Sequence, residues 1–314
     1  MVRLGVIGVG ALGKHHARIY SGLDGVNLIG VADIRSDRAS ATAREYGCLG
    51  FGDYRELIGK VDAVSIAAPT VDHTSIGVEC IESGLDVLVE KPIAATLEDA
   101  QVLVDAAERH ARILQVGHVE RFNPIVEAAS VVASTPQFFE VHRLSVFSMR
   151  SLDIDVVLDL MIHDIDVILS LVRSEVAEIR ASGIPVLSSK ADIANVRIEF
   201  ADGCVANMTA SRVSTDKVRK LRFFQPHDYV SIDYAEQSGY RLSLQGGRIV
   251  NQKLEPTSRE PLVVELESFV EAVRDRTAPR VDGKAGMRAL EVALAVNLEI
   301  ERHAARRTAA RADG

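Results

Sequence analysis

The stretch VRLGVIGVGALG, residues 2–13, decides the fold of this chain. Its first half is apolar and predicts a short buried strand, and residues 14–20 predict a helix that follows at once. Gly8, Gly10 and Gly13 occupy the turn between them with the spacing G-x-G-x-x-G. Such glycines allow a tight turn, leave room beside the backbone and permit close packing of the helix. The stretch therefore predicts the first strand and helix of a Rossmann domain.

The same turn predicts a dinucleotide site at the amino terminus of the helix. We expect a pyrophosphate to be held by the backbone of Gly8, Gly10, Ala11, Leu12 and Gly13. A second predicted strand, residues 26–32, ends at Asp33, which lies twenty residues after Gly13. A carboxylate there accepts hydrogen bonds from a ribose 2'-hydroxyl and favours NAD. Arg35 follows closely and suits a 2'-phosphate, so NADP stays an alternative.

Alternating strands and helices continue to about residue 120. Further buried strands are predicted at residues 62–68, 85–89 and 112–116, with helices at residues 74–83 and 96–110. This alternation is typical of an α/β domain with a doubly wound parallel sheet. Ligands of such sheets bind beyond the carboxyl ends of the strands. We therefore expect one loop to border the nicotinamide half of the cofactor through Ala68, Pro69, Thr70 and His73.

The histidines near this edge have two interpretations. His15, His16 and His73 either contact the cofactor or substrate, or are simply solvated, and none of them is assigned a catalytic role.

Lys91 lies where the buried strand at residues 85–89 runs into a loop, in the tripeptide Glu90-Lys91-Pro92. A rigid strand that ends there directs a cation towards bound ligand, so we expect Lys91 to bind or orient the substrate. Glu90 and Pro92 are expected to border the cofactor as well. A surface lysine ahead of a proline-stiffened turn is the alternative.

A second polar cluster lies in residues 156–171, which predict a helix that is apolar almost all round and therefore buried. Asp159, His163 and Asp166 fall on one face of that helix. Buried polar groups need a partner, a ligand or a cleft, so this face is a candidate active site. An intrahelical Asp-His pair is the alternative. A metal site is disfavoured because no second histidine or cysteine cluster lies nearby, and we expect none.

These residue types suit hydride transfer from an alcohol. His163 can take the hydroxyl proton as a base near neutrality, while Asp159 or Asp166 orients its ring. Lys91 would then bind the same oxygen and favour the developing alkoxide.

Bulk composition narrows the class of protein. With 314 residues, 47% of them hydrophobic and 25% charged, the chain has ordinary globular composition and room for two domains. A net charge of -8 argues against a nucleic-acid surface. No apolar run is long enough for a membrane span, and three distant cysteines fit a reducing compartment. We therefore expect a cytoplasmic protein that binds no nucleic acid and no membrane.

The second half predicts a sheet of its own. Strand-like segments lie at residues 138–149, 192–200, 204–212, 217–224 and 229–233, with a hairpin turn at residues 201–203 and a helical stretch at residues 265–307. We place the boundary near residues 117–124, which predicts a nucleotide-binding domain at residues 1–120 and a substrate domain at residues 121–314.

Three motifs together resemble the Gfo/Idh/MocA (glucose-fructose oxidoreductase and inositol dehydrogenase) family: the glycine turn, Glu90-Lys91-Pro92, and Asp159-x-x-x-His163-x-x-Asp166. The resemblance spans the whole chain. It implies a carboxyl-terminal domain with a large, mostly antiparallel, open-faced sheet that often forms homodimers or homotetramers. It also implies catalytic positions for Lys91, Asp159 and His163.

Residues 117–124 and 211–225 resemble a subgroup that includes UDP-N-acetylglucosamine 3-dehydrogenases. The resemblance implies an NAD(P)-dependent enzyme that oxidises the 3-hydroxyl of this nucleotide sugar, with Arg121 and Asn123 at the mouth of the substrate cleft. Four basic residues among the six at 217–222 suit a diphosphate or, equally, a subunit interface. The alternatives are an inositol or simple-sugar dehydrogenase, a reductase of carbon-carbon or carbon-nitrogen double bonds, and a non-catalytic dinucleotide sensor.

Overall fold

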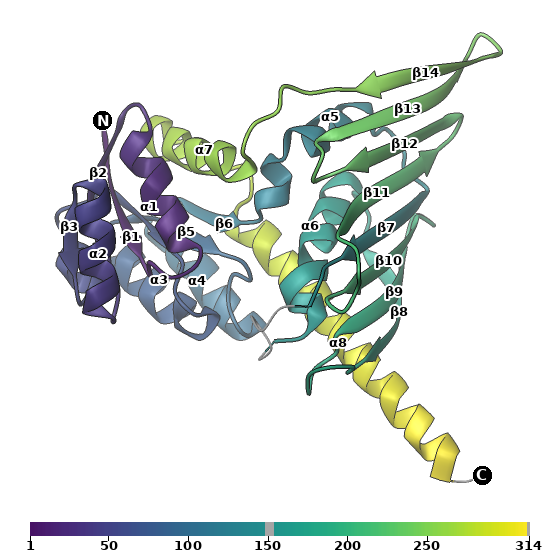
Figure 1. Ribbon diagram of the computed structural model, residues 1–314, viewed down its shortest axis with the longest axis horizontal. Helices are drawn as coiled ribbons and strands as arrows, with labels where there is room; N and C mark the ends of the chain where they lie inside the picture. Colours follow the sequence, from purple (N-terminus) through teal and green to yellow (C-terminus); the bar gives the residue numbers. More distant parts are fainter. Residues whose placement is uncertain (148–153, 313–314) are drawn as a thin grey trace. The chain divides into compact units, whose positions relative to one another are not determined.

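The computed structural model describes residues 1–147 and 154–312, which form two compact units (Figure 1). Unit 1 comprises Met1–Val119 and Glu260–Leu290, and unit 2 comprises Glu120–Arg259 and Glu291–Gly314. Unit 1 thus begins with Met1–Val119, where a nucleotide-binding domain at residues 1–120 was expected. The expected second domain at residues 121–314 needs correction, because residues 260–290 return to unit 1.

Unit 1 is built on a parallel sheet of six strands in the order β3-β2-β1-β4-β5-β6. The strands are β1 (Val2–Ile7), β2 (Val26–Ala32), β3 (Leu49–Phe51), β4 (Ala63–Ile66), β5 (Asp86–Glu90) and β6 (Leu114–Gly117). The helices between them are α1 (Gly13–Gly22), α2 (Ser36–Tyr46), α3 (His73–Glu82) and α4 (Leu97–Arg109), with 3-10 turns at Tyr54–Leu57, Thr70–Asp72 and Val119–Phe122. The strand order reverses between β1 and β4, which is where a doubly wound sheet binds its ligand. The predicted Rossmann domain is confirmed.

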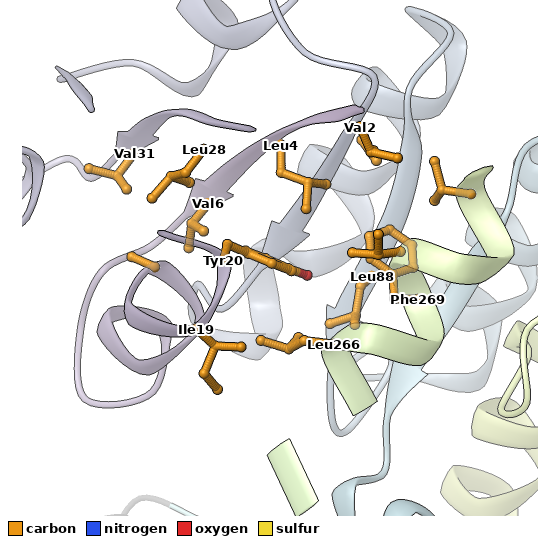
Figure 2. Packing of buried hydrophobic residues seen from close by; sticks show 14 of the residues in the cluster. Val2, Leu4, Val6, Ile19, Tyr20, Leu28, Val31, Leu88, Leu266 and Phe269 are labelled. Atoms are coloured by element: carbon orange, nitrogen blue, oxygen red, sulfur yellow. The ribbon is translucent and has the colours of Figure 1, made fainter. Parts of the chain in front are cut away.

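A long-range apolar cluster explains why residues 260–290 belong to unit 1. Helix α7 (Pro261–Asp275) places Leu266, Phe269 and Val270 among the buried side chains of β1 and α1 (Figure 2). Figure 2 shows Phe269 and Leu266 close to Leu88, with Tyr20 nearby. Beyond α7, the Val116 N–H donates to the carbonyl oxygen of Val281, and helix α8 (Gly283–Ala312) follows.

Unit 2 is built on an eight-stranded sheet in the order β14-β13-β12-β11-β7-β10-β9-β8. The strands are β7 (Phe138–Leu144), β8 (Val176–Ile184), β9 (Ile193–Phe200), β10 (Val205–Ser211), β11 (Val218–Gln225), β12 (Asp228–Asp233), β13 (Ser238–Gln245) and β14 (Arg248–Leu254). Only β7 and β10 pair in parallel among these strands, so the large, mostly antiparallel sheet is confirmed. Strands β8, β13 and β14 were not predicted, and the last two residues of the segment predicted at 138–149 lie outside the described ranges.

The two faces of this sheet differ in cover. Helices α5 (Pro124–Val132) and α6 (Ile162–Leu171) lie over one face (Figure 1). Strand β9 shows the alternation: Ala194, Val196 and Ile198 are buried, while Asn195 and Arg197 on the opposite face are exposed. We call the second face the open face. Within residues 1–147 and 154–312, no helix is both long and apolar enough to cross a membrane.

Candidate active site

The glycine turn after β1 has the geometry that its spacing predicts. Gly8 has a φ of +84°, and a Cβ there would lie 2.8 Å from the backbone of Ala67. A Cβ on Gly13 would lie 1.8 Å from the carbonyl oxygen of Gly8, so only glycine permits this approach of α1. A Cβ on Gly10 would have the Arg38 guanidinium as its nearest neighbour, at 3.8 Å, so the space beside this glycine is open. The turn therefore fits a dinucleotide pyrophosphate against its backbone and the start of α1.

Asp33 stands beside this turn at the end of β2. Its Oδ2 accepts the Val9 N–H at 2.9 Å, and its Oδ1 accepts the Arg35 N–H at 2.9 Å. The Arg35 guanidinium lies 2.9 Å from Asp37, and the hydrogen bond from Arg35 lowers the pKa of that carboxyl group. A fixed carboxylate and an arginine engaged elsewhere fit the ribose of NAD better than the 2'-phosphate of NADP.

Glu90 is a buried support for Lys91. Its Oε1 lies 3.0 Å from Nε2 of His16, which is fully buried, and its Oε2 accepts the Lys91 N–H at 3.3 Å. A Cβ on Gly117 of β6 would lie 2.8 Å from Glu90 Oε2, so this carboxylate is enclosed from both sides. Glu90 therefore fixes the end of β5 rather than offering an exposed carboxylate. Lys91 itself is partly exposed.

His73 joins two loops at the carboxyl edge of the sheet. Its Nδ1 lies 3.0 Å from the carbonyl oxygen of Pro92, and its Nε2 lies 2.9 Å from that of Ala68. The ring is 1% exposed, and burial lowers its pKa. His16 and His73 are thus buried, which corrects the interpretation of both as solvated histidines, whereas His15 is exposed. Pro69 and Thr70, beside Ala68, remain predicted cofactor contacts.

In unit 2, Asp159 and His163 are partly exposed, but they do not lie in one continuous α-helix. Val157–Met161 forms a π-helical turn, and α6 begins only at Ile162. Asp155 caps this segment, because its Oδ1 accepts the N–H groups of Val157 at 2.9 Å and Leu158 at 3.0 Å. Single π turns are frequent at functional sites, so the departure from α geometry supports a functional role for this segment.

Asp166 does not share the exposure of the other two polar residues. It is 2% exposed, and its Oδ1 lies 3.5 Å from Nη1 of Arg121. Arg121 is thus engaged by a carboxylate in unit 2. Asn123 is also 2% exposed: its amide donates to Glu120 and to the carbonyl oxygen of Tyr234, and its Oδ1 accepts the N–H that starts α5. The expected place of Asn123 at a cleft mouth is therefore corrected to a buried helix cap.

A buried ion-pair network, which the sequence did not reveal, supports α6. Arg143 of β7 binds Asp164 through Nε at 2.7 Å and Nη2 at 2.9 Å, and its Nη1 lies 3.0 Å from Glu120. The guanidinium also lies over the Tyr234 ring, 5.1 Å from its centroid. Burial raises the pKa of Asp164, whereas Arg143 opposes that rise. Since Asp164 follows His163, this network fixes the helix that carries the candidate base.

Arg212 belongs to a second buried support. Its Nε lies 2.8 Å from Asp192, and its Nη1 donates to the carbonyl oxygen of Ile154, just before the π turn. Burial opposes ionisation of Asp192, but hydrogen bonds from Ser188, two loop N–H groups and Arg212 outweigh it and hold its pKa well below the ordinary value. Arg212 therefore positions the segment of Asp159. Across the described residues, no group of histidine, cysteine and carboxylate side chains could hold a metal ion.

Comparisons with known proteins agree with this geometry. Residues 2–118 match the model of the Gfo/Idh/MocA oxidoreductase family with an NAD-binding Rossmann fold, and residues 128–225 match that of the Gfo/Idh/MocA carboxyl-terminal domain. A UDP-N-acetylglucosamine 3-dehydrogenase of Acidithiobacillus ferrooxidans is 34% identical, covering 96% of this chain and 97% of that protein. A solved structure of that enzyme aligns with a TM-score of 0.91 and 35% identity, covering 96% of this chain and 98% of the other. An inositol 2-dehydrogenase of Rubrobacter xylanophilus is 30% identical, covering 68% of this chain and 65% of that protein.

Proposed function

The chain belongs to the Gfo/Idh/MocA family of NAD-binding oxidoreductases, and from this premise we propose that it oxidises the 3-hydroxyl group of UDP-N-acetylglucosamine to a ketone. The observation that carries this substrate is the 34% identity over 96% of the chain to the enzyme of that name. The match to the inositol 2-dehydrogenase of Rubrobacter xylanophilus gives weaker support to an inositol dehydrogenase activity, because that match covers 68% of the chain.

The proposal gives each candidate residue a chemical task. When bound in the glycine turn, NAD supplies the hydride acceptor. His163 removes the hydroxyl proton, because an imidazole is the side chain whose ordinary pKa suits a base near neutrality. Asp159 orients that ring and stabilises its protonated form. Lys91 binds the same hydroxyl oxygen and favours its alkoxide form.

A substrate panel tests the proposal. The full chain is mixed with NAD and, separately, with UDP-N-acetylglucosamine, N-acetylglucosamine and myo-inositol, and NADH formation is followed by absorbance. We expect turnover with the nucleotide sugar and at least roughly tenfold less with the other two, since they lack the nucleotide's binding groups. Faster turnover of myo-inositol would instead support the inositol dehydrogenase alternative. NAD binding without turnover of any compound would instead support a non-catalytic dinucleotide sensor.

We also propose that the open face packs against a second copy of the chain. Phe138, Phe224, Tyr229 and Tyr240 form a row across four strands of that face, with ring centroids 4.8 to 5.7 Å apart. Two of its cations are paired within the face, Arg222 with Glu140 at 3.4 Å and Lys220 with Asp233 at 3.9 Å. A row of aromatic side chains on a sheet face that no helix covers suits self-association. Light scattering should find a dimer or tetramer, and Y229E should dissociate it; a monomeric wild type would overturn this proposal.

A further inference from the structure

The basic strand, residues 217–222, divides its charges between the two faces of the unit 2 sheet. Lys220 and Arg222 point to the open face, where each lies within ion-pair distance of a carboxylate. Arg219 shares the helix-covered face with Leu221 and Phe223, which are fully buried. Lys217 precedes β11 (Val218–Gln225) and is exposed. Within β11, Arg219 is therefore the cation on the side of the sheet that α6 covers.

Arg219 lies beside another arginine. It is the register partner of Arg143 on the neighbouring antiparallel strand β7. Like charges directly opposite each other repel unless an anion lies between them. Glu120 is 3.0 Å from Nη1 of Arg143 but 4.0 Å from Nη1 of Arg219. Since Glu120 also accepts from the Asn123 amide at 3.1 Å, the carboxylates of this network are committed mainly to Arg143.

The guanidinium of Arg219 is left with unused donors. Among the residues that the structure describes, the guanidinium has no hydrogen-bond partner. The Glu120 carboxylate, at 4.0 Å from Nη1, is within ion-pair distance only, and Nε is buried without a partner. Its side chain is 34% exposed, so a ligand can reach it. Burial, and then the charge of Arg143, lower its pKa. Such a cation gains strongly from an added anion, above all from one with oxygens that match its planar fork.

We propose that Arg219 binds the diphosphate of the nucleotide-sugar substrate, an assignment that rests on the proposed function. In that substrate the diphosphate is attached at carbon 1 of the sugar and the reacting hydroxyl at carbon 3, so the anion-binding group must be distinct from the base. Arg219 meets this requirement. Its neighbour Arg143 is bound to Asp164, and Asp164 directly follows the candidate base His163 in α6. The same face of one unit thus carries both groups.

Calorimetric titration of the full, NADH-loaded chain with UDP and with uridine tests this assignment. The variants are R219Q, R219K and R222Q, the last on the same strand but on the open face. We expect R219Q to weaken UDP binding roughly tenfold to a hundredfold, the range for losing charge-assisted hydrogen bonds. Uridine binding should not change. R219K should lose less UDP affinity than R219Q, since lysine keeps the charge but lacks the planar guanidinium. R222Q should bind UDP as the wild type does.

Steady-state kinetics give a second readout. R219Q should raise the KM for UDP-N-acetylglucosamine by a similar factor and leave kcat within about threefold, because it removes binding that substrate and transition state share. Melting temperatures without ligand show whether each variant folds, and R219M, which keeps the aliphatic stem, replaces R219Q if glutamine unfolds the protein.

Three results would overturn the assignment: a wild type that does not bind UDP, an R219Q variant that binds UDP normally, or equal losses in R219Q and R222Q. Failure of the proposed function has a different signature. UDP would then still bind through Arg219, while UDP-N-acetylglucosamine would not be turned over by any variant, wild type included.

Discussion

Unit 1 and unit 2 hold their candidate site residues by different means. In unit 1, the end of β5 is fixed by close approach: Glu90 is enclosed between His16 and Gly117, where a Cβ would lie 2.8 Å from its carboxylate. In unit 2, α6 is fixed by buried charge, through the two hydrogen bonds from Arg143 to Asp164 at 2.7 and 2.9 Å.

The difference has a consequence for each kind of site. Close approach depends on the absence of side-chain atoms, so it tolerates no added volume. Buried ion pairs depend on both partners, so removing one leaves an uncompensated charge. Substitutions in each unit can separate these two mechanisms.

Removal of Asp164 should give the largest loss of stability. D164A leaves Arg143, which is 2% exposed, without its main partner, so we expect the free energy of unfolding to fall by about 3–5 kcal/mol. The control is E178A, which breaks the exposed pair of Glu178 with Arg180 and should cost far less, because solvent screens that pair. Urea unfolding measures both. Equal losses would mean that buried charge does not hold α6.

Removal of the candidate base should leave the fold intact but not the activity. H163A should lower kcat roughly a hundredfold or more, because general-base catalysis contributes about that factor. NADH affinity, measured by fluorescence titration, should not change, since the glycine turn belongs to unit 1. H142A, which alters an exposed histidine on the open face, is the matched control. If H163A weakens NADH binding as much as turnover, His163 is not the base.

Added volume should disturb unit 1 at Gly117 but not at Gly52. G117A places a methyl group against the Glu90 carboxylate, so we expect a loss of about 1–3 kcal/mol and a lower kcat as the end of β5 shifts. G52A is the control, because a Cβ there meets nothing within 4 Å. Thermal unfolding and turnover are measured for both. A neutral G117A would show that unit 1 does not depend on close approach at this strand.

The smallest effect concerns pH. Burial lowers the pKa of His73 below its unfolded value of about 6.5. The unfolded chain therefore takes up this proton first as pH falls, so the stability is fully present above about pH 6.5 and declines below it, by at most about 1.4 kcal/mol per pH unit for one proton. H73N should flatten this part of the pH profile of unfolding, whereas H15N, at an exposed site, should not. An unchanged slope in H73N would contradict the assignment.

Much of the fold followed from local pattern. The strands of unit 1 at β1, β2, β4, β5 and β6 were predicted, as was a helix that begins at Thr96, whose hydroxyl accepts the Asp99 N–H at 3.1 Å. Strands β8, β13 and β14 escaped prediction. In β14, Arg248–Leu254, six of seven residues are exposed, so apolar alternation was missing there.

The candidate site was only partly predictable. The π turn at Val157–Met161 was read as ordinary α-helix, because both share an apolar, non-alternating pattern. Asn123 was placed at the cleft mouth because residues 117–124 leave the sheet and resemble a substrate-specific subgroup. In the structure its amide group donates to the carbonyl oxygen of Tyr234 and its Oδ1 accepts the Ile125 N–H, in the interior. One signal for Arg143 was present: it lies in a predicted strand at a position that alternates in phase with the buried Phe139 and Val141.

The Rossmann fold, the dinucleotide turn, the place of Lys91 at a predicted strand end and that of His163 on a predicted helix follow from the sequence alone, because these depend on backbone conformation and spacing along the chain. Three features come from the tertiary structure: α7 completes the core of unit 1, Arg143 and Arg212 support the segment of Asp159 and His163, and Arg219 is the cation of β11 on the face that α6 covers. These depend on contacts between residues far apart in sequence. Burial and pairing of charge are decided by such contacts, and local pattern does not record them.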